Sequence, residues 1–475
     1  MNAPFRSATM NSIRTACLAL CSLSLVACVN LAPDYARPAL PVAKQFEAST
    51  LAEPAASNAL QNLPAVAFFA DTRLKPLLEM ALQNNRDLRV AALNIEVAQA
   101  QLGVRQADLL PSVNVGLNGS RLTTAAGGIS STYTTGLSVA AYEIDVFQRL
   151  RNLTETARAQ YLATEEARKT VHISLLASVA STYLAWQSDI ALLDLTQKTI
   201  GTREATVKLL QLRFDKGVSS LLDLRSAQSL LESARITHAQ LRRQKQLDEN
   251  ALTLLVGQTI PASLLTESSV LDGHFKPVTF DELPVGLSSE VLLGRPDVAQ
   301  SELLLKASNA NIGAARAAFF PKITLTGSLG LASSDLTNLF RNGLTAWSFA
   351  PQILQPIFDA GRNESNLQIA QANRSIAQAQ YEKTVQSAFK EVSDALIARA
   401  TLKDQWSAQK AQTQAEQDRA QLSQLRYKQG VNSYLDALDA ERSLFVSQQA
   451  LIQIHIQYAQ NMVTLYRGLG GGWSR

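Results

Sequence analysis

The spacing of apolar positions predicts unusually long helices. From Arg149 to Lys216 the chain contains no proline and a single glycine. Within this stretch, apolar residues recur at alternating steps of three and four, at Leu176, Val179, Tyr183, Trp186, Ile190 and Leu193. This is heptad spacing, so we expect a helix about 100 Å long that packs lengthwise against other helices.

Two other stretches alternate between apolar and polar residues. Val113, Val115 and Leu117 alternate with polar or small neighbours, and a weaker alternation follows a loop of small residues. A period of two is typical of strands. The pattern therefore predicts a β-hairpin over residues 112–141, and its recurrence later in the chain predicts a second over 322–355.

A twelve-residue motif occurs twice, at residues 212–223 and 425–436, and predicts a tight turn between two helices. Each copy contains one glycine, Gly217 or Gly430, which can adopt the left-handed conformation that often ends a helix. A Ser-x-x-Asp pair follows each glycine at the spacing of a capping box, at Ser220, Asp223, Ser433 and Asp436. Each copy therefore predicts the tip of an antiparallel helical hairpin.

These elements recur in the same order, so the chain is a duplication. Residues 85–255 and 295–467 each predict a helix, a β-hairpin and a helical hairpin, the latter over 149–255 and 361–467. A segment rich in glycine and proline, residues 256–294, links the two repeats and is expected to lie at the equator of the molecule. The ends are expected to be an extended segment with an equatorial helix and a loose glycine-rich tail, at residues 28–84 and 468–475.

Residues 1–27 have the organisation of a secretory signal peptide. Arg14 precedes a short apolar run that ends in small residues before Cys28. The spacing resembles the lipobox of bacterial lipoproteins, which implies cleavage before Cys28 and a diacylglyceryl group on its sulfur. The alternative is an ordinary signal peptide followed by an unmodified cysteine. Val29 directly after the cysteine implies sorting to the outer membrane.

Composition narrows the function classes. The net charge is only +4, and we find no basic patch interleaved with aromatic residues, so a nucleic-acid partner is not expected. The four histidines show no metal-ligand spacing, and the chain lacks H-E-x-x-H and P-loop motifs. We therefore expect neither an enzyme nor a cofactor beyond the lipid on Cys28. The histidines are His172, His238, His274 and His455.

Four strands cannot close a transmembrane barrel, because about eight is the smallest closed number. An open sheet edge is not tolerated in lipid. Three copies would supply twelve strands and six helical hairpins, enough for a barrel and a hollow helical cylinder. The pattern therefore predicts a homotrimer.

The chain resembles the outer membrane efflux protein family, the TolC-like outer membrane factors, in its NodT-type lipoprotein branch. Beside both tip motifs, the resemblance rests on Tyr142–Phe147, Leu283–Glu290, Arg295–Asp297, Ala317–Pro321 and Pro356–Arg362. One departure is Gln148, which stands where family members usually have glycine.

The resemblance implies a mostly α fold with β-structure. A trimeric twelve-stranded β-barrel would span the outer membrane, and an α-barrel would extend into the periplasm. It further implies docking on a periplasmic adaptor and an inner-membrane pump, with passive exit of drugs or other small molecules. The rival hypothesis is a lipid-anchored periplasmic coiled-coil adaptor or structural protein.

The hairpin tips are the candidate docking surface, because an exposed turn between rigid helices is a natural partner site. The tip residues are Arg213, Gly217, Val218, Ser219, Arg426, Gly430, Val431 and Asn432. For the glycines and serine, turn geometry alone is the alternative explanation.

Asp439 is the candidate periplasmic gate. It has no acidic counterpart in the first repeat, where Ser226 occupies the matching position. Tripled by symmetry, it would form an anionic ring at the mouth of the tube. Leu435, four residues earlier, would add an apolar constriction, and the family's periplasmic closure falls at these matching positions. The alternative is a solvated surface aspartate.

Overall fold

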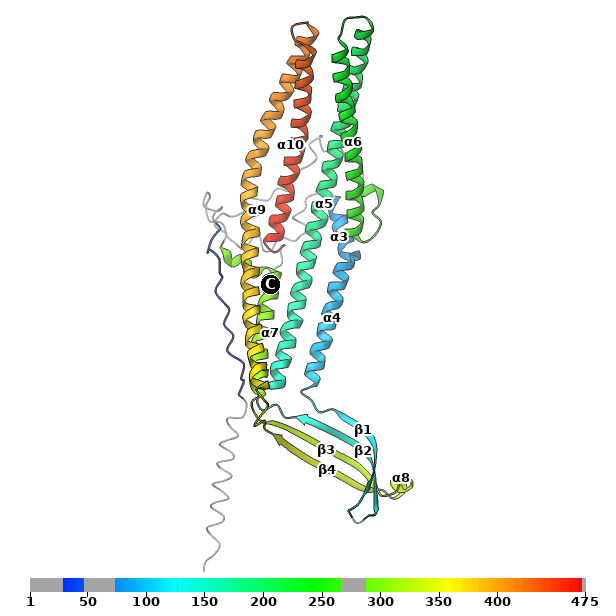
Figure 1. The fold of residues 1–475 in the computed structure, drawn as a ribbon, viewed down its shortest axis with the longest axis vertical. Coiled ribbons are helices and arrows are strands. Elements are labelled where there is room, and N and C mark those ends of the chain that lie inside the picture. Colours follow the sequence, from blue (N-terminus) through cyan, green and yellow to red (C-terminus); the bar gives the residue numbers. More distant parts are fainter. Residues whose placement is uncertain (1–28, 47–72, 126, 266–287, 472–475) are drawn as a thin grey trace, which may run out of the picture. The chain divides into compact units, whose positions relative to one another are not determined.

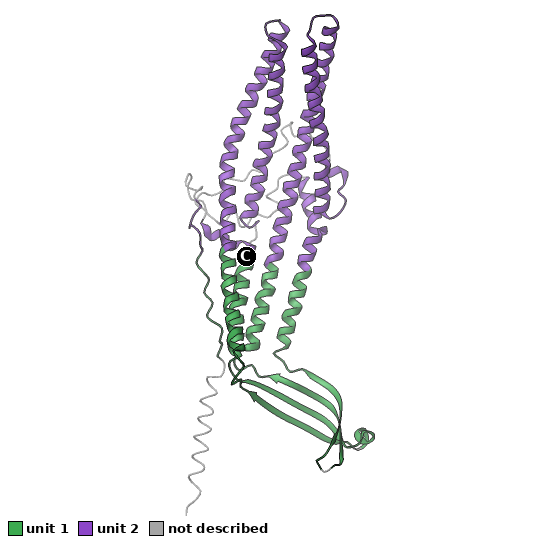
Figure 2. Cartoon of the chain, viewed as in Figure 1, with its two compact units in different colours: residues 1–39, 93–165, 300–382 green, residues 40–92, 166–299, 383–475 purple. Residues whose placement is uncertain are grey.

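The structure is a computed structural model that describes residues 29–46, 73–125, 127–265 and 288–471. It contains two compact units, coloured separately in Figure 2. The first unit comprises residues 1–39, 93–165 and 300–382, and the second comprises residues 40–92, 166–299 and 383–475. Each unit combines segments of both sequence repeats.

A four-stranded antiparallel sheet belongs to the first unit, with the strands in chain order (Figure 1). The strands are β1 (Val113–Thr123), β2 (Ile129–Glu143), β3 (Lys322–Ser333) and β4 (Leu344–Leu354). Both predicted β-hairpins are therefore present, and pairing of β2 with β3 joins the two repeats. Strands β1 and β4 form the edges of this sheet. Between β3 and β4 lie two short helices, η5 (Leu336–Asn338) and α8 (Leu339–Asn342).

Four helices continue from the strands of this unit. They are α4 (Arg86–Ala107), α5 (Arg149–Asp215), α7 (Pro296–Ala317) and α9 (Arg362–Lys428). The hydroxyl of Thr154 on α5 donates to the carbonyl of Arg105 on α4 at 3.1 Å, and that of Thr156 on α5 donates to Ala307 on α7 at 3.2 Å. The amide of Asn363 on α9 donates to Ala318, at the end of α7, at 3.1 Å. The helices therefore follow the same order as the strands.

The second unit contains both hairpins. The first is formed by α5 and α6 (Leu221–Val256), and the second by α9 and α10 (Tyr434–Gly468) (Figure 1). Three shorter helices complete the described part of this unit: α3 (Leu74–Asn84), η2 (Ala262–Leu265) and η4 (Ser289–Gly294). Among the described helices, none is both long and apolar enough to cross a membrane.

The predicted heptad stripe of α5 forms the main core of the second unit. Leu176, Val179, Tyr183, Trp186 and Ile190 are all buried there, together with residues of α3, α6 and α10. The rings of Tyr183 and Trp186 stack with their centroids 5.8 Å apart. Lengthwise packing of this long helix is therefore confirmed.

The expectation of a loose glycine-rich tail is wrong for residues 468–471. Arg295, itself buried, donates a hydrogen bond to the carbonyl of Gly468 at 2.7 Å. The hydroxyl of Tyr466 donates to the carbonyl of Gly471 at 2.5 Å. A Cβ atom on Gly471 would lie only 2.7 Å from Ile173, so the backbone approaches α5 closely. These contacts hold the end of α10 against its neighbours.

Candidate functional site

One face of the sheet is apolar and exposed. A single row of paired positions crosses all four strands, and it consists of Val115, Leu137, Leu329 and Trp347. These side chains are 80%, 49%, 57% and 75% exposed, respectively. A row of this kind on a protein surface is costly in water and is typical of a face that another apolar phase covers.

The opposite face of the sheet is polar. The adjacent row of paired positions consists of Asn114, Ser138, Ser328 and Ser348. The hydroxyls of Ser328 and Ser348 are hydrogen bonded at 2.7 Å. Because alternate residues of a strand point to opposite faces, the sheet has one apolar face and one polar face. This is the arrangement of a transmembrane barrel, apolar outward and polar inward.

Both hairpin tips have the same backbone geometry. At the first tip, Val218 N donates to Arg213 O and Gly217 N donates to Phe214 O, each at 2.8 Å. Gly217 has a positive φ of 71°, and Gly430 at the second tip has 74°. This pattern is a Schellman motif, which satisfies the last carbonyls of a helix. Both tips are therefore stiff turns.

Each return helix begins with a capping box. The Ser220 hydroxyl accepts from Asp223 N, and the Asp223 carboxylate accepts from Ser220 N. Ser433 and Asp436 repeat this arrangement at the second tip. At the two apices, Val218 and Val431 are 73% and 62% exposed. The tips thus present an apolar side chain on a rigid support.

The two tips are not equivalent. Arg213 on α5 donates a hydrogen bond of 2.7 Å to the hydroxyl of Tyr427 on α9, and its guanidinium lies 5.4 Å from the centroid of that ring. Arg426, which matches Arg213 in the second repeat, instead donates to Asn432 in its own turn at 3.0 Å. Arg213 therefore joins the two hairpins, whereas Arg426 stiffens one.

Asp439 is exposed but paired. Arg419 on α9 donates to its carboxylate at 2.7 Å, and Arg442 on α10 lies 3.8 Å from its other oxygen. Leu435, one turn earlier on α10, is exposed. The structure thus places both candidate gate residues on the second hairpin and adds a partner, Arg419, that the sequence interpretation did not include.

The first strand-to-helix joint forms although it contains Gln148. This residue has a φ of 54°, a left-handed conformation that is unfavourable for a side chain with a Cβ. The carboxylate of Asp145 accepts from the backbone N–H groups of Leu150 and Arg151 at 3.0 and 2.8 Å, which caps α5. In the second repeat, Gly361 takes the left-handed position with a φ of 82°. The departure from the family pattern therefore leaves the joint in place with local backbone strain.

The extended segment over residues 30–37 binds along α7. Glu302 on α7 is buried and accepts hydrogen bonds from Tyr35 and Arg37 at 3.2 and 3.0 Å. Asn309 donates to Pro33 O at 2.7 Å, and Arg316 donates to Leu31 O at 3.0 Å. The segment therefore runs antiparallel to α7 and extends toward its sheet-proximal end.

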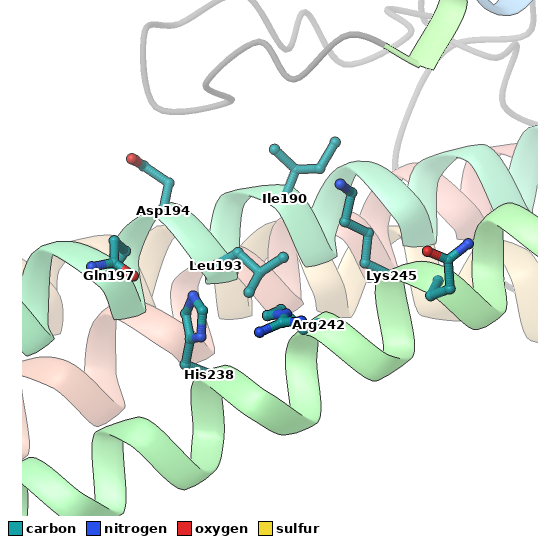
Figure 3. A pocket seen from close by; sticks show the side chains of 8 residues that line it. Ile190, Leu193, Asp194, Gln197, His238, Arg242 and Lys245 are labelled. Carbon is teal, nitrogen blue, oxygen red and sulfur yellow. The ribbon is translucent and has the colours of Figure 1, made fainter. Parts of the chain in front are cut away.

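The three described histidines lie on three different helices, His172 on α5, His238 on α6 and His455 on α10. His238 lies with Arg242 and Lys245 at a pocket between α5 and α6 (Figure 3). Burial lowers the pKa of both His172 and His455, which favours their neutral forms. Among the described residues, no group of three histidine, cysteine or acidic side chains could hold a metal ion.

Several predicted features lie outside the described residues. They are the signal peptide over residues 1–27, Cys28, residues 47–72 of the extended segment and residues 472–475 of the tail. Residues 266–287 of the linker, with His274 and the part of the Leu283–Glu290 motif before Ser288, also lie outside. The sequence interpretation missed Arg419 and Glu302, both of which act through partners in other segments. Arg419 could have been found from hairpin symmetry, since it lies eleven residues before Gly430 and Asp439 lies nine after it.

The family model for outer membrane efflux proteins matches residues 77–258 and 287–471. The probable efflux pump outer membrane protein TtgC of Pseudomonas putida is 43% identical over 470 residues, covering 96% of this chain and 95% of the relative. The cation efflux system protein CusC of Escherichia coli O157:H7 is 41% identical over 458 residues, covering 96% and 98%.

Solved structures agree with these sequence relatives. The open state of the Neisseria gonorrhoeae MtrE outer membrane channel superposes with a TM-score of 0.85 at 39% identity, covering 94% of this chain and 99% of that one. The CusC structure superposes with a TM-score of 0.83 at 40% identity, covering 94% and 100%. The fold of the chain is therefore that of an outer membrane channel.

Proposed function

The chain belongs to the outer membrane efflux protein family, and from this we propose that three copies form the outer-membrane exit duct of a tripartite efflux system. The sheets of three copies would close a twelve-stranded barrel, and their hairpins would form a periplasmic α-barrel. The duct would be passive, because transport energy would be supplied by the inner-membrane pump. A periplasmic adaptor would connect the pump to the duct.

The observation that carries this proposal is the sheet with two unlike faces and two free edges. Its apolar row at Val115, Leu137, Leu329 and Trp347 suits contact with lipid, and its polar row suits a water-filled lumen. A four-stranded sheet with this polarity needs partner strands on both edges before it can enter a bilayer. A soluble adaptor has no use for such an exposed apolar face, so the rival hypothesis is less well supported.

The hairpin tips are proposed as the adaptor-docking surface. The exposed valines Val218 and Val431 stand on stiff Schellman turns, so a partner would bind them with little loss of conformational entropy. Arg213, Ser219, Arg426 and Asn432 would form the polar surroundings of these two apolar contacts. The turn glycines would contribute indirectly, through the backbone conformation that they allow at each tip.

Leu435 and Asp439 are proposed as the periplasmic gate. Both are exposed on the second hairpin, and threefold symmetry would bring three copies of each together. The pairing of Asp439 with Arg419 would fix the position of the carboxylate and connect the two helices of that hairpin. The pair could therefore hold the hairpin in its closed position.

A lipid on Cys28 is proposed as a second membrane attachment. The described chain begins at Val29, and Leu31 is held beside the sheet-proximal end of α7 by Arg316. That end of α7 leads directly into β3, which begins at Lys322. An anchor at this level would enter the membrane beside the apolar face of the sheet.

The names of the relatives support weak selection of substrate by the duct. They include a toluene efflux pump protein, an antibiotic efflux pump protein and a cation efflux protein. When proteins of one fold take part in the efflux of such different compounds, a common channel wall explains the fold better than a common binding site does. We therefore expect the pump and adaptor to determine which compounds leave.

Purification from the outer membrane in detergent tests the proposal. We expect trimers that dissociate only on heating in SDS and that form ion-conducting pores in planar bilayers. A water-soluble monomer after removal of the lipid would instead support the adaptor hypothesis. A pore formed by a single subunit would contradict the proposed trimer.

A further inference from the structure

A cavity lies between the two hairpins within one copy of the chain. Its volume is about 420 Å³, and its lining comes from α5, α9 and α10. This volume falls within the range of about 300 to 1,000 Å³ that is typical of pockets for drug-sized ligands. The described lining residues all belong to the second compact unit. The described walls of the cavity therefore come from a single copy.

The cavity contains a buried guanidinium. Arg203 on α5 is only 5% exposed, although an arginine side chain stays charged in proteins. It donates a hydrogen bond to the carbonyl of Leu230 on α6 at 2.6 Å, and it lies 5.0 Å from the centroid of the Phe445 ring on α10. These contacts fix the position of the guanidinium, but neither partner carries a negative charge.

No ion pair neutralises Arg203 in the described part of the chain. Glu441 on α10 lines the same cavity, and its charge acts on Arg203, but the two side chains form no direct ion pair. Burial lowers the pKa of Arg203 and raises the pKa of Glu441, so each charge is unfavourable where it stands. Because a buried charge without a hydrogen-bonded counterion is costly, an anionic group that enters the cavity would be favoured.

The rest of the lining suits a molecule with an apolar body. Leu195, Leu444 and Phe445 supply apolar surface. Glutamines of α9 and α10 supply amide groups that can donate or accept hydrogen bonds, and they are Gln417, Gln421, Gln424 and Gln448. Apolar walls with a few polar groups are the usual composition of small-molecule sites.

We propose that this cavity binds a small amphipathic organic acid, whose carboxylate pairs with Arg203 and whose apolar body lies against Phe445. The planar guanidinium matches a carboxylate through parallel hydrogen bonds. The ligand would contact α5 of the first hairpin together with α9 and α10 of the second. It would therefore hold the two hairpins together and oppose opening, a consequence that rests on the proposed function and its gate on the second hairpin.

Equilibrium dialysis of the purified protein in lipid nanodiscs tests the site, with empty nanodiscs as the blank. The test compounds are 4-biphenylacetate and its neutral primary amide, which have nearly the same shape but differ in charge. We expect the acid to bind about tenfold more tightly than the amide, because only the acid forms a charged hydrogen bond with Arg203. Arg203→Gln should abolish this difference. Equal affinities of acid and amide for the unmodified protein would overturn the proposal.

A second variant tests the cavity without changing the guanidinium. Thr202 is exposed and lines the cavity, so the indole of Thr202→Trp should fill it and abolish binding of the acid. Gly201→Trp is the matched control, because Gly201 is exposed and a Cβ atom there would meet no other atom within 4 Å. This control should bind the acid like the unmodified protein. Equal binding by the two tryptophan variants would show that the acid binds elsewhere.

Glu441 distinguishes an acidic ligand from a basic one. We expect Glu441→Gln to bind 4-biphenylacetate several-fold more tightly, because a neighbouring negative charge is removed. Binding of 4-phenylbenzylamine in preference to the acid, with loss of that binding in Glu441→Gln, would overturn the proposed acid in favour of an amine.

Planar bilayers test the effect on opening. The acid should lower the opening frequency of the unmodified channel and of Gly201→Trp, but not that of Thr202→Trp. Binding of the acid without this effect would overturn the link between the hairpins. Because the described walls come from one copy, dialysis reports on the site even if the protein forms neither trimers nor pores, which is the result that would contradict the proposed function.

Discussion

Arg213 and Tyr427 join the two hairpins at their tips through a hydrogen bond of 2.7 Å and a cation–π contact of 5.4 Å. We expect Tyr427→Phe to remove the hydrogen bond alone. This change should weaken the interaction free energy between the two tips by about 1 to 3 kcal/mol. Arg213→Ala should lose about 0.5 to 1 kcal/mol more, because it also removes the cation–π contact. Opening frequency in planar bilayers should therefore rise in both variants, and further in Arg213→Ala. Arg225→Ala, which loses only an exposed contact to Gln228, is the control.

Removal of the Asp439 carboxylate should open the periplasmic mouth. We expect Asp439→Ala to raise single-channel conductance and antibiotic leak, because both the anionic ring and the link to Arg419 are lost. Arg419→Ala removes the link together with an ion pair to Glu416, and it leaves each Asp439 carboxylate with only the more distant Arg442, so it should raise cation selectivity. Asp418→Ala, an exposed neighbour bound by Gln414, should leave conductance unchanged. Conductance of Asp439→Ala equal to that of the unmodified channel would contradict the gate.

Replacing Gln148 with glycine should stabilise the protein. The residue has a φ of 54°, and glycine removes the steric cost of that conformation, about 1 kcal/mol. Gly361→Ala at the second joint should cost a similar amount, since its φ of 82° is left-handed too. Thermal unfolding of trimers in detergent measures both. A lower melting temperature for Gln148→Gly would show that the glutamine side chain contributes more than its backbone costs.

Glu302 should hold the segment over residues 30–37 on α7. Burial opposes ionisation, but hydrogen bonds from Arg37 and Lys306 hold the pKa of Glu302 below its ordinary value. The ionised carboxylate of Glu302 therefore stabilises the folded chain at neutral pH. This stabilisation is lost as the pH falls through the folded-state pKa. We expect Glu302→Gln to weaken the binding of this segment to α7 by about 1 to 3 kcal/mol. This range already allows for solvent screening of the ion pair, because Arg37 is partly exposed.

Limited chymotrypsin digestion measures this effect at Tyr35, which contacts Glu302 and is followed by Ala36. Cleavage there should be faster in Glu302→Gln at pH 7, whereas Glu364→Gln, an exposed change on α9, should digest like the unmodified chain. Equal rates in all three proteins would show that the segment is held by its other contacts with α7.

Asp189 on α5 should make the first hairpin less stable against unfolding at alkaline pH. Burial, the charge of Asp248 and a hydrogen bond between the two side chains raise its pKa to about 7. The folded chain therefore keeps a proton that the unfolded chain releases above about pH 4, so stability falls as the pH rises through this window.

Asp189→Asn retains the neutral form at every pH. We expect a higher melting temperature at pH 8, by about 2 to 4 °C for each kcal/mol recovered, and little change at pH 5. Asp194→Asn is the matched control, because that carboxylate is partly exposed and paired with Lys198. A gain of the same size at both pH values would contradict titration of Asp189.

The helices were predictable because their signals are local. Heptad spacing and the absence of proline determined α5, which ends at Asp215, one residue before the predicted boundary. Gly217 and Gly430 marked the turns because no other residue type adopts that conformation at so little cost. The alternation around Val115 likewise identified a strand and its apolar side.

The pairings between distant segments were not predictable in this way. Arg37 and Glu302 are 265 residues apart, and nothing in either local sequence indicates the other. Arg213 and Arg426 occupy equivalent places in the repeat yet bind different partners, a tyrosine of the other hairpin in one case and Asn432 of its own turn in the other. Such contacts depend on which helices lie side by side, and so do the contacts of the segment that follows α10 up to Gly471.

Assembly through the free edges of the sheet also determines whether a mutation is dominant or recessive. A barrel assembled from identical subunits mixes the products of every copy of the gene in the cell, so a defective subunit with intact edges would enter the same assemblies as normal ones. If half of the subunits carried the defect, only about one assembly in eight would be free of it. A lesion at the tips should therefore be dominant over the normal allele, whereas a lesion that abolishes edge pairing should be recessive.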